Sequence, residues 1–246
     1  MNKEYTIYGI NNSENLLLNQ KPYTINKIYI LKDGRAYKNK SISSILNKIK
    51  NKVIYLDKKK FFNLFEYKHS QGIVVSFSAS FYNNRINYNN SKINQCYIIC
   101  DQITDPQNLG QIIRTSECAG IDGIILPKHG SVHVTNSVLQ VSQGAFLYTD
   151  IYTVNNLVNI IKEMKKEGFW VVGVENGVEA KNWYEIDFKG KVVIVIGSEG
   201  KGIRTLVKKS CDFLTTIPMP GKINSLNVSA ALSAILFERQ RQILSK

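Results

Sequence analysis

Apolar residues follow two patterns along this chain, short unbroken runs and longer segments with helical spacing. In the second part of the chain, unbroken runs alternate with helical segments; the runs lie near residues 95–103, 122–126, 169–174, 191–196 and 213–217. A strand that is buried on both faces needs such a continuous apolar composition. The pattern therefore predicts an α/β fold in which helices cover both faces of a parallel sheet.

The first third of the chain predicts a smaller α/β domain. Strands are expected at residues 27–33, 53–57 and 69–79, and helices at 41–51 and 58–67. A polar, asparagine-rich segment follows and is typical of a linker. We therefore expect a small domain at residues 1–78, a linker at 79–93 and a second domain at 94–246.

Composition narrows the class of protein. The 246 residues are 43% hydrophobic, which is ordinary for a globular protein. No run of about 18 apolar residues is present to cross a membrane, and the amino terminus lacks the apolar core of a signal peptide. The four cysteines form no CxxC pair, so we interpret them as buried thiols in a reducing compartment. With only three histidines, we expect no metal site. The lack of an apolar span and of a signal-peptide core favours a cytoplasmic location.

Positive charge is concentrated in the first third of the chain. Residues 1–91 carry 15 Lys and Arg against 5 Asp and Glu, a net charge of +10, whereas residues 92–246 carry 17 against 14, a net charge of +3. A cationic module of this kind suits a phosphate backbone. A lysine- and asparagine-rich proteome is the alternative explanation. In Lys58–Phe65, phenylalanines next to lysines could stack on bases, but core packing of the aromatic rings is the favoured interpretation.

Three segments of the second domain carry candidate chemistry. In residues 105–127, Asp105 and Pro106 form a turn, and we expect Asn108 and Arg114 near one end of the helix that follows. In residues 191–203, a β-branched strand runs into a glycine-rich exit, whose backbone could approach a ligand closely. In residues 217–233, prolines and a glycine end a strand before a helix that is capped near Asn227.

In this order, the three segments resemble the motifs of the SpoU (TrmH) branch of the SPOUT RNA methyltransferases. The resemblance covers roughly residues 95–240 and is greatest to the enzymes of that branch that methylate a guanosine ribose in 23S ribosomal RNA. It implies a carboxyl-terminal domain with a deep trefoil knot at about residues 191–233, and S-adenosylmethionine as cofactor. It also implies a homodimer, formed through helices near the knot. The first domain is similar to RNA-binding domains related to certain ribosomal proteins.

The resemblance also implies the site residues. The cofactor-binding residues would be Gly197, Ile217 and Leu226, acting through main chain and apolar packing. The catalytic group would comprise five residues, Asn108, Arg114, Glu199, Ser225 and Asn227. Because a guanidinium stays protonated, we expect Arg114 to hold a phosphate and stabilise the developing oxyanion rather than to act as base.

Each of these residues also has a purely structural interpretation. Asn108 alone could be a cap or turn residue, Glu199 could accept backbone N–H bonds at a helix start, and Arg114 could be a solvated charge. Their conjunction favours an S-adenosylmethionine-dependent 2′-O-methyltransferase that acts on a 23S ribosomal RNA guanosine. A transfer RNA guanosine methyltransferase is the alternative, and a catalytically inactive RNA-binding relative is the third hypothesis.

Overall fold

The protein forms two compact units. The computed structural model describes residues 3–19, 23–66, 69–89, 91–176, 180–198 and 200–245. The amino-terminal unit comprises Met1–Phe81 together with Val134–Tyr148, and the carboxyl-terminal unit comprises Tyr82–His133 and Thr149–Lys246. The segment Val134–Tyr148 thus belongs to the first unit, although its place in the sequence is inside the range 94–246.

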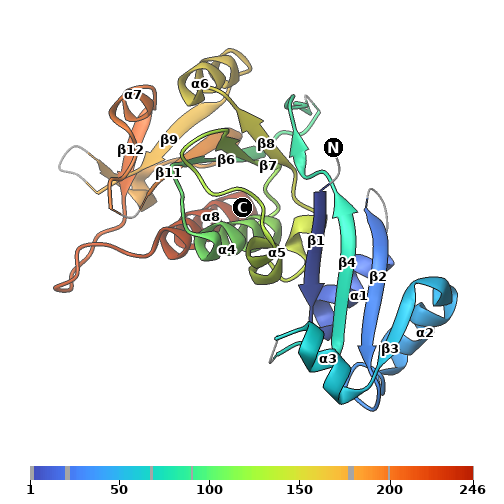
Figure 1. Cartoon of the computed structure of the whole chain (residues 1–246). Coiled ribbons are helices and arrows are strands. Elements are labelled where there is room, and N and C mark those ends of the chain that lie inside the picture. The colour runs from blue at the N-terminus through green and yellow to red at the C-terminus, as the bar shows by residue number, and fades with distance from the viewer. Residues whose placement is uncertain are drawn as a thin grey trace. The chain divides into compact units, whose positions relative to one another are not determined.

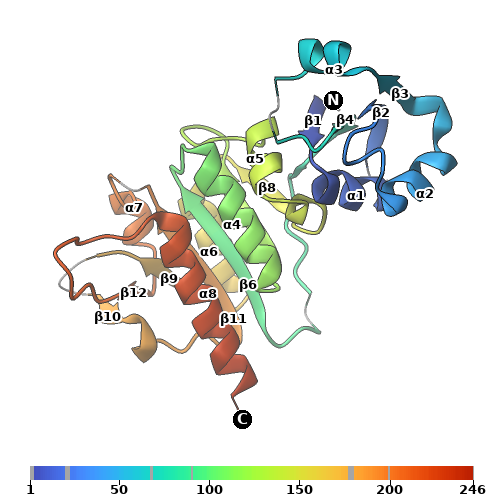
Figure 2. The same cartoon turned by 90° about the horizontal axis from the view of Figure 1, so that it is seen from below.

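The amino-terminal unit is built on a four-stranded sheet with the order β1-β4-β2-β3 (Figure 1). The strands are β1 (Lys3–Tyr8), β2 (Thr24–Leu31), β3 (Val53–Leu56) and β4 (Ile73–Ala79). Helices α1 (Ile10–Leu18) and α2 (Lys40–Lys48) lie on one face and α3 (Lys58–Leu64) on the other, as Figure 2 shows. A short 3-10 helix, η1 (Lys50–Lys52), precedes β3. The strands and helices predicted for this region are present; β1 and α1 were not predicted.

The segment from the middle of the chain completes the amino-terminal unit at the edge strand β1. It contains α5 (Asn136–Val141) and the 3-10 helix η2 (Ala145–Leu147). The Thr6 amide donates to Asn136 Oδ1 at 3.0 Å, and the Gln140 side chain bonds both the amide and the carbonyl of Tyr8 at 3.1 Å. Side-chain amides thereby satisfy edge groups that would otherwise be open to another strand.

The carboxyl-terminal unit has an eight-stranded parallel sheet with the order β10-β12-β9-β11-β6-β7-β8-β5. The strands predicted from the apolar runs are all present: β6 (Gln95–Asp101), β7 (Gly123–Pro127), β9 (Trp170–Val174), β11 (Lys191–Gly197) and β12 (Phe213–Thr216). Three short strands were not predicted, namely β5 (Tyr82–Asn83), β8 (Ile151–Val154) and β10 (Lys181–Asn182), the last leading into η3 (Trp183–Glu185). The α/β prediction with a parallel sheet is confirmed.

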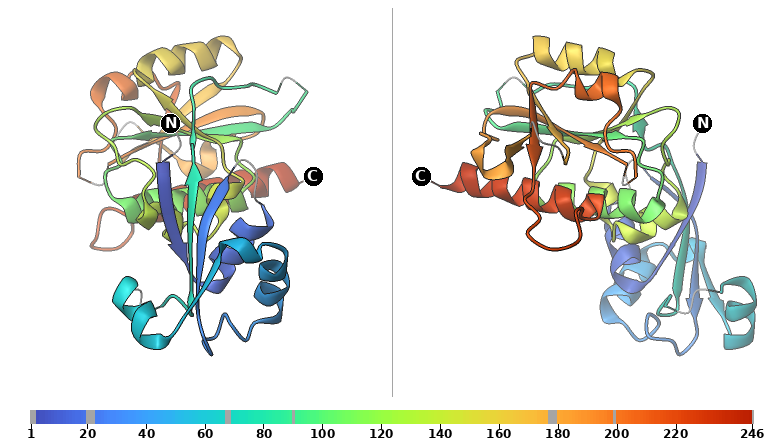
Figure 3. Two further views of the ribbon diagram at one scale, coloured as in Figure 1. Left: turned by 45° about the vertical axis from the view of Figure 1, so that its right-hand side comes forward. Right: turned by 90° about the vertical axis from the view of Figure 1, so that its left-hand side faces the viewer.

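Helices cover both faces of this sheet (Figures 1 and 3). On one face lie α4 (Pro106–Cys118) and α8 (Val228–Leu244), and on the other lie α6 (Leu157–Lys166) and α7 (Thr205–Lys208). The central strands β6 and β11 are buried almost throughout, as their continuous apolar sequence requires. Cys96 and Cys100 on β6 are accordingly buried, whereas Cys211 is half-buried and Cys118 at the end of α4 is exposed. The prediction of four buried thiols is thus confirmed for the two cysteines of β6 and was wrong for Cys118.

The order of the strands determines where loops meet. From β6 the chain proceeds to β7 and β8 on one side, and it then returns to β9 on the far side of β11. In open parallel sheets, ligands bind beyond the carboxyl ends of the strands where the order reverses. Here that point lies between β6 and β11, whose last residues, Asp101 and Gly197, are paired in register.

Candidate active site

A pocket opens beyond the carboxyl ends of β9, β11 and β12. It has a volume of about 440 Å³, within the range of small-molecule sites. The loops after the three strands supply its lining, together with the first turn of α8. The lining residues are Val174, Glu175, Asn176, Ile196, Gly197, Ser198, Gly200, Lys201, Gly202, Ile217, Met219, Asn224, Ser225, Leu226, Val228 and Ala231. We call it the first pocket.

Four residues singled out from the sequence line the first pocket together: Gly197, Ile217, Ser225 and Leu226. Gly197 ends β11, Ile217 follows β12, and the other two precede α8. Leu226 is 44% exposed, so its side chain is available to pack on a ligand. The fold thus brings the last two of the three sequence segments to one cavity.

Asn176, a residue that the sequence did not point to, holds this wall in place. Its Nδ2 donates to the Asn224 carbonyl at 2.8 Å, and its Oδ1 accepts from Thr216 Oγ1 at 3.2 Å. One side chain therefore ties the end of β12 to the loop that leads into α8. A polar pair directly after the buried strand β9, Glu175 and Asn176, was the available signal.

The glycine-rich loop after β11 is tightly packed against itself. A Cβ on Gly197 would lie 2.1 Å from the backbone carbon of Gly202, and Gly202 has a φ of 65°. These two glycines are therefore needed by the loop's own backbone. At Gly200, by contrast, a Cβ would meet nothing within 4 Å.

Two carboxylates support the same loop from beneath. Glu175 Oε2 accepts from the Ile203 amide at 3.0 Å and lies 3.4 Å from Lys208 Nζ. Asp101 is fully buried and accepts from the amide of Arg204 at 2.8 Å and from its Nε at 2.7 Å. Both interactions fix the backbone that follows the glycines, and neither residue was predicted.

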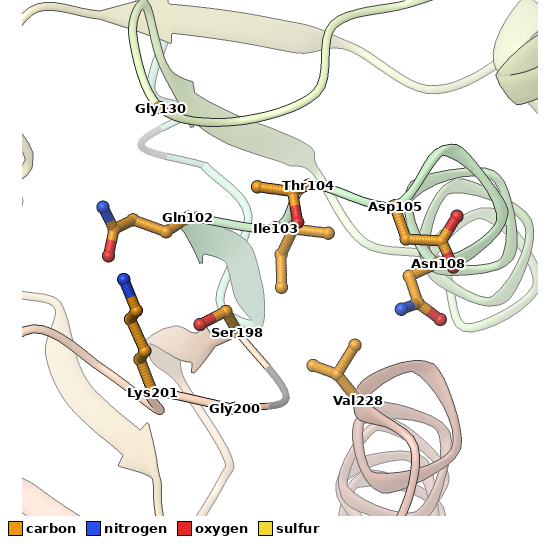
Figure 4. Close-up of a pocket in the computed structure, with 10 residues that line it drawn as sticks. All are labelled: Gln102, Ile103, Thr104, Asp105, Asn108, Gly130, Ser198, Gly200, Lys201 and Val228. Carbon is orange, nitrogen blue, oxygen red and sulfur yellow. The ribbon is translucent and has the colours of Figure 1, made fainter.

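A second pocket of about 330 Å³ adjoins the first. Figure 4 shows its lining, which comes from the segment after β6, the first turn of α4, the loop after β7, the glycine-rich loop and the start of α8: Gln102, Ile103, Thr104, Asp105, Asn108, Gly130, Ser198, Gly200, Lys201 and Val228. Four of these residues, Ser198, Gly200, Lys201 and Val228, line both pockets. A small molecule in the first pocket would therefore lie next to one in the second.

Asn108 and Asn227 connect the helices that border the two pockets. Asn227 Nδ2 donates to Asn108 Oδ1 at 2.8 Å. Asn227 also caps α8, because its Oδ1 accepts from the Ser229 amide at 2.9 Å. In the first turn of α4, the capping oxygen comes from Asp105 rather than from Asn108. The predicted cap at Asn227 is thus confirmed, and the alternative interpretation of Asn108 as a capping residue does not apply.

Arg114 lies apart from these residues. It is exposed on α4 and lines neither pocket. Six residues of helix place it about 9 Å along the axis from Asn108 and about 1.7 turns around it. The prediction that the two side chains lie near one end of the helix was therefore wrong. The expected site residue Glu199 lies outside the described residues, between Ser198 and Gly200 of the pocket lining.

Across the described part of the chain, no group of three or more His, Cys, Asp or Glu side chains is arranged to hold a metal ion. Within the same residues, no helix combines the length and the apolar composition that a membrane span requires.

Sequence comparison assigns the family. The model of the SpoU rRNA methylase family matches residues 95–237, more than half of the chain. The chain belongs to the SpoU rRNA methylase family. A second model, described as the substrate-binding domain of RNA 2′-O ribose methyltransferases, matches residues 6–83.

Individual relatives agree with this membership. A Staphylococcus haemolyticus protein named for the TrmH family of tRNA/rRNA methyltransferases is 36% identical over 227 residues, 89% of each chain. The Ralstonia nicotianae 23S rRNA (guanosine-2′-O-)-methyltransferase RlmB is 41% identical over 145 residues, which are 59% of this chain and 58% of that enzyme. The chain thus aligns with little more than half of the RlmB sequence.

The fold has relatives among solved structures. The SpoU methyltransferase AviRb from Streptomyces viridochromogenes, crystallised in complex with the cofactor AdoMet, superposes with a TM-score of 0.81 at 20% identity. The superposition covers 98% of this chain and 91% of AviRb. At this identity, the likeness is one of fold.

Proposed function

We propose that this protein transfers a methyl group from S-adenosylmethionine to a ribose 2′-hydroxyl of RNA, and that the acceptor is a guanosine of 23S ribosomal RNA. The observation that carries the proposal is the convergence of Gly197, Ile217, Ser225 and Leu226 on one pocket in a chain of the SpoU family. The cytoplasm, where ribosomal RNA of a bacterial type is processed, is the proposed location.

The first pocket fits the cofactor. Its apolar side chains, Ile196, Ile217, Met219 and Leu226 among them, offer packing for an adenine ring. Backbone groups of the glycine-rich loop and the amides of Asn176 and Asn224 line the same cavity and can bond polar groups. Gly197, Ile217 and Leu226 would hold the cofactor, and Ser225 would support the loop around its methionine end. The proposed threading of residues 191–233 as a trefoil knot would bring these loops together.

When bound, the cofactor supplies an electrophilic methyl group on a sulfonium. The protein's task is then to bring the ribose hydroxyl into line with it and to favour loss of the hydroxyl proton. Arg114 would grasp the adjacent phosphate with its fork of donors and stabilise the oxyanion, and the proton would pass to phosphate or water. Asn108, Asn227 and Glu199 would set the loop geometry.

The place of Arg114 outside both pockets supports a homodimer as part of the proposal. Helix α8, next to α4, carries Phe237 and Leu244 on its surface at 52% and 77% exposure, seven residues and thus about two turns apart. Such an apolar stripe can be buried against a second copy. A second subunit docked there would bring another Arg114 to the region of the pockets.

The amino-terminal unit favours ribosomal over transfer RNA as substrate. It holds most of the chain's net charge and matches the substrate-binding family model. A transfer RNA guanosine is the second candidate, because the name of the S. haemolyticus relative includes both RNA classes.

Two measurements test the proposal. Purified protein should bind S-adenosylmethionine in calorimetry, and no measurable affinity would favour an inactive RNA-binding relative. Ribose methylation should then be mapped in RNA from cells with and without the protein. One guanosine of 23S ribosomal RNA should lose its mark; unchanged ribosomal RNA together with a lost transfer RNA mark would select the second candidate.

A further inference from the structure

Gln102 has a backbone conformation that most side chains avoid. Within the described residues, positive φ occurs outside glycine at Asp33, Gln71, Gln102 and Gln143, with values of 52° to 61°. Aspartate tolerates this region comparatively well. Gln71 accepts a hydrogen bond from the Ile10 amide at 2.7 Å, and Gln143 donates one to the Gln140 carbonyl at 2.7 Å. Both glutamines therefore support the fold through their side chains.

Gln102 gives the fold no such support. Its φ is 61°, and its side chain makes no hydrogen bond to any residue that the structure describes. It follows β6 directly and lines the second pocket. Strained backbone conformations that the fold does not need are often found at functional sites. The surroundings of the Gln102 side chain therefore indicate what its conformation serves.

What Gln102 faces is Lys201. Figure 4 shows the ends of the two side chains pointing toward one another at one side of the second pocket. Lys201 is exposed and has no ion pair or hydrogen bond with the described part of the chain. The pair thus presents one acceptor and two donors from a carboxamide, next to three donors from an ammonium group.

We infer that Gln102 and Lys201 read the base of the acceptor nucleotide, and that this base is guanine. The inference rests on the proposed function and deepens it, because it assigns the second pocket to the acceptor. Guanine offers a donor, N1–H, next to the acceptor O6, which complements a carboxamide. Its O6 and N7 also give an ammonium group two acceptors on one edge. Adenine presents an amino group instead of O6, so it would offer the ammonium group only N7 and would place a donor against it.

The connection between the pockets agrees with this assignment. Ser198 and Gly200 line both, so a nucleoside in the second pocket lies beside a methyl donor in the first. Bases of unpaired RNA are commonly splayed out and bonded on their edges in this manner. Asp105, which caps α4, and Asn108 in its first turn line the second pocket and would face the ribose side of the same nucleotide.

The test uses the full-length protein, labelled S-adenosylmethionine and ribosomal RNA from cells that lack the protein. The variants are Gln102→Gly and Lys201→Ala. Gln143→Gly is the matched control, because it makes the same change at another positive φ, at a residue that lines neither pocket. Each protein is measured for thermal stability, for cofactor affinity and for methyl transfer, and the methylated nucleoside is identified after digestion.

Gln102→Gly should raise the melting temperature, because glycine adopts this φ without strain. It should leave the cofactor dissociation constant unchanged and lower kcat/KM for RNA by about tenfold or more. Lys201→Ala should lower kcat/KM likewise, and Gln143→Gly should transfer at the wild-type rate. Opposite effects on stability and on transfer are not expected of a residue with a structural role.

Three results would overturn the inference. If Gln102→Gly and Lys201→Ala both transfer at the wild-type rate, the pair does not read the base. If the wild type methylates a nucleoside other than guanosine, the assignment of guanine to the second pocket is wrong, although the proposed methyl transfer stands. If the wild type binds the cofactor and labels no RNA, the proposed function fails and the inference with it.

Discussion

Gly197 and Gly200 lie three residues apart in the loop of the first pocket but differ in the space around them. A Cβ on Gly197 would overlap the backbone of Gly202 at 2.1 Å, whereas one on Gly200 would meet nothing within 4 Å. Gly197→Ala should therefore displace the loop and abolish cofactor binding. It should also lower the free energy of unfolding by about 3 kcal/mol or more. Gly200→Ala is the control for packing within the loop and should keep the wild-type stability. Calorimetry and thermal unfolding check both, and equal behaviour of the two variants would contradict the account.

Arg114 separates binding of the cofactor from transfer of the methyl group. Because the side chain is exposed and lines neither pocket, Arg114→Ala should leave cofactor affinity nearly intact. Turnover should fall by at least about a hundredfold, as for the loss of one donor to a developing oxyanion. Gln111→Ala, an exposed position one turn earlier on the same helix, is the control. Wild-type rates in Arg114→Ala would remove this residue from the mechanism.

The reactivity of the cysteines should differ between buried and exposed positions. Burial raises the pKa of Cys96 to about 12 and raises the pKa of Cys100 well above its usual value. Only the thiolate is nucleophilic. Both thiols should therefore stay protonated and unreactive as the pH rises from 7 to 9. The exposed Cys118 should react with iodoacetamide in the native protein over that range. Mass spectrometry of the labelled peptides checks this; equal labelling of Cys100 and Cys118 before unfolding would contradict it.

At the scale of elements, the sequence was most informative where burial is complete. Five strands of the second sheet were recognised because each is an apolar run that a two-sided sheet requires. Strands β5 and β10 were missed because each has only two residues, too few for a pattern. Likewise, the pocket lining by Ile217 and Leu226 followed from family motifs, whereas Asp101 acts through contacts that link distant segments and have no local signature.

Helix α8 carries the test of the proposed dimer. Phe237→Glu would place a charge in the apolar stripe of α8, and a buried unpaired charge is strongly unfavourable. We expect this variant to be monomeric in light scattering, to bind the cofactor and to lose turnover. Leu206→Glu is the control, since Leu206 is 72% exposed on α7, on the opposite face of the sheet. A dimeric and active Phe237→Glu protein would rule out this face as the interface.

At the scale of the whole molecule, the division into units does not follow the order of the sequence. Residues Val134–Tyr148 were assigned to the range 94–246, because a linker near residue 80 was the only break that composition revealed. Their place in the amino-terminal unit depends on side-chain bonds to β1 and on Phe146, which packs on Phe77 and Phe81. Such long-range pairing leaves no periodicity in the sequence.

This division into units also determines how the contribution of the amino-terminal unit to RNA binding should be tested. Removing residues 1–78 would remove the bonding partners of Asn136 and Gln140 on β1 and the contact of Phe146 with Phe77, so a loss of RNA binding in the truncated protein would be ambiguous. Charge neutralisation in the full chain avoids that difficulty. Lys58 and Lys59 are exposed in the first turn of α3, in the unit that holds most of the net charge.

Lys58→Gln combined with Lys59→Gln should weaken RNA binding and make it less sensitive to salt, because the protein then neutralises fewer phosphates and binding releases fewer counterions. The slope of log affinity against log salt should fall by about 1 to 2. The control pair, Lys162→Gln and Lys166→Gln, removes the same charge from exposed positions of α6 in the other unit. If both pairs lower the slope equally, the charge of the whole molecule holds the RNA. If only the control pair lowers the slope, the carboxyl-terminal unit makes the phosphate contacts.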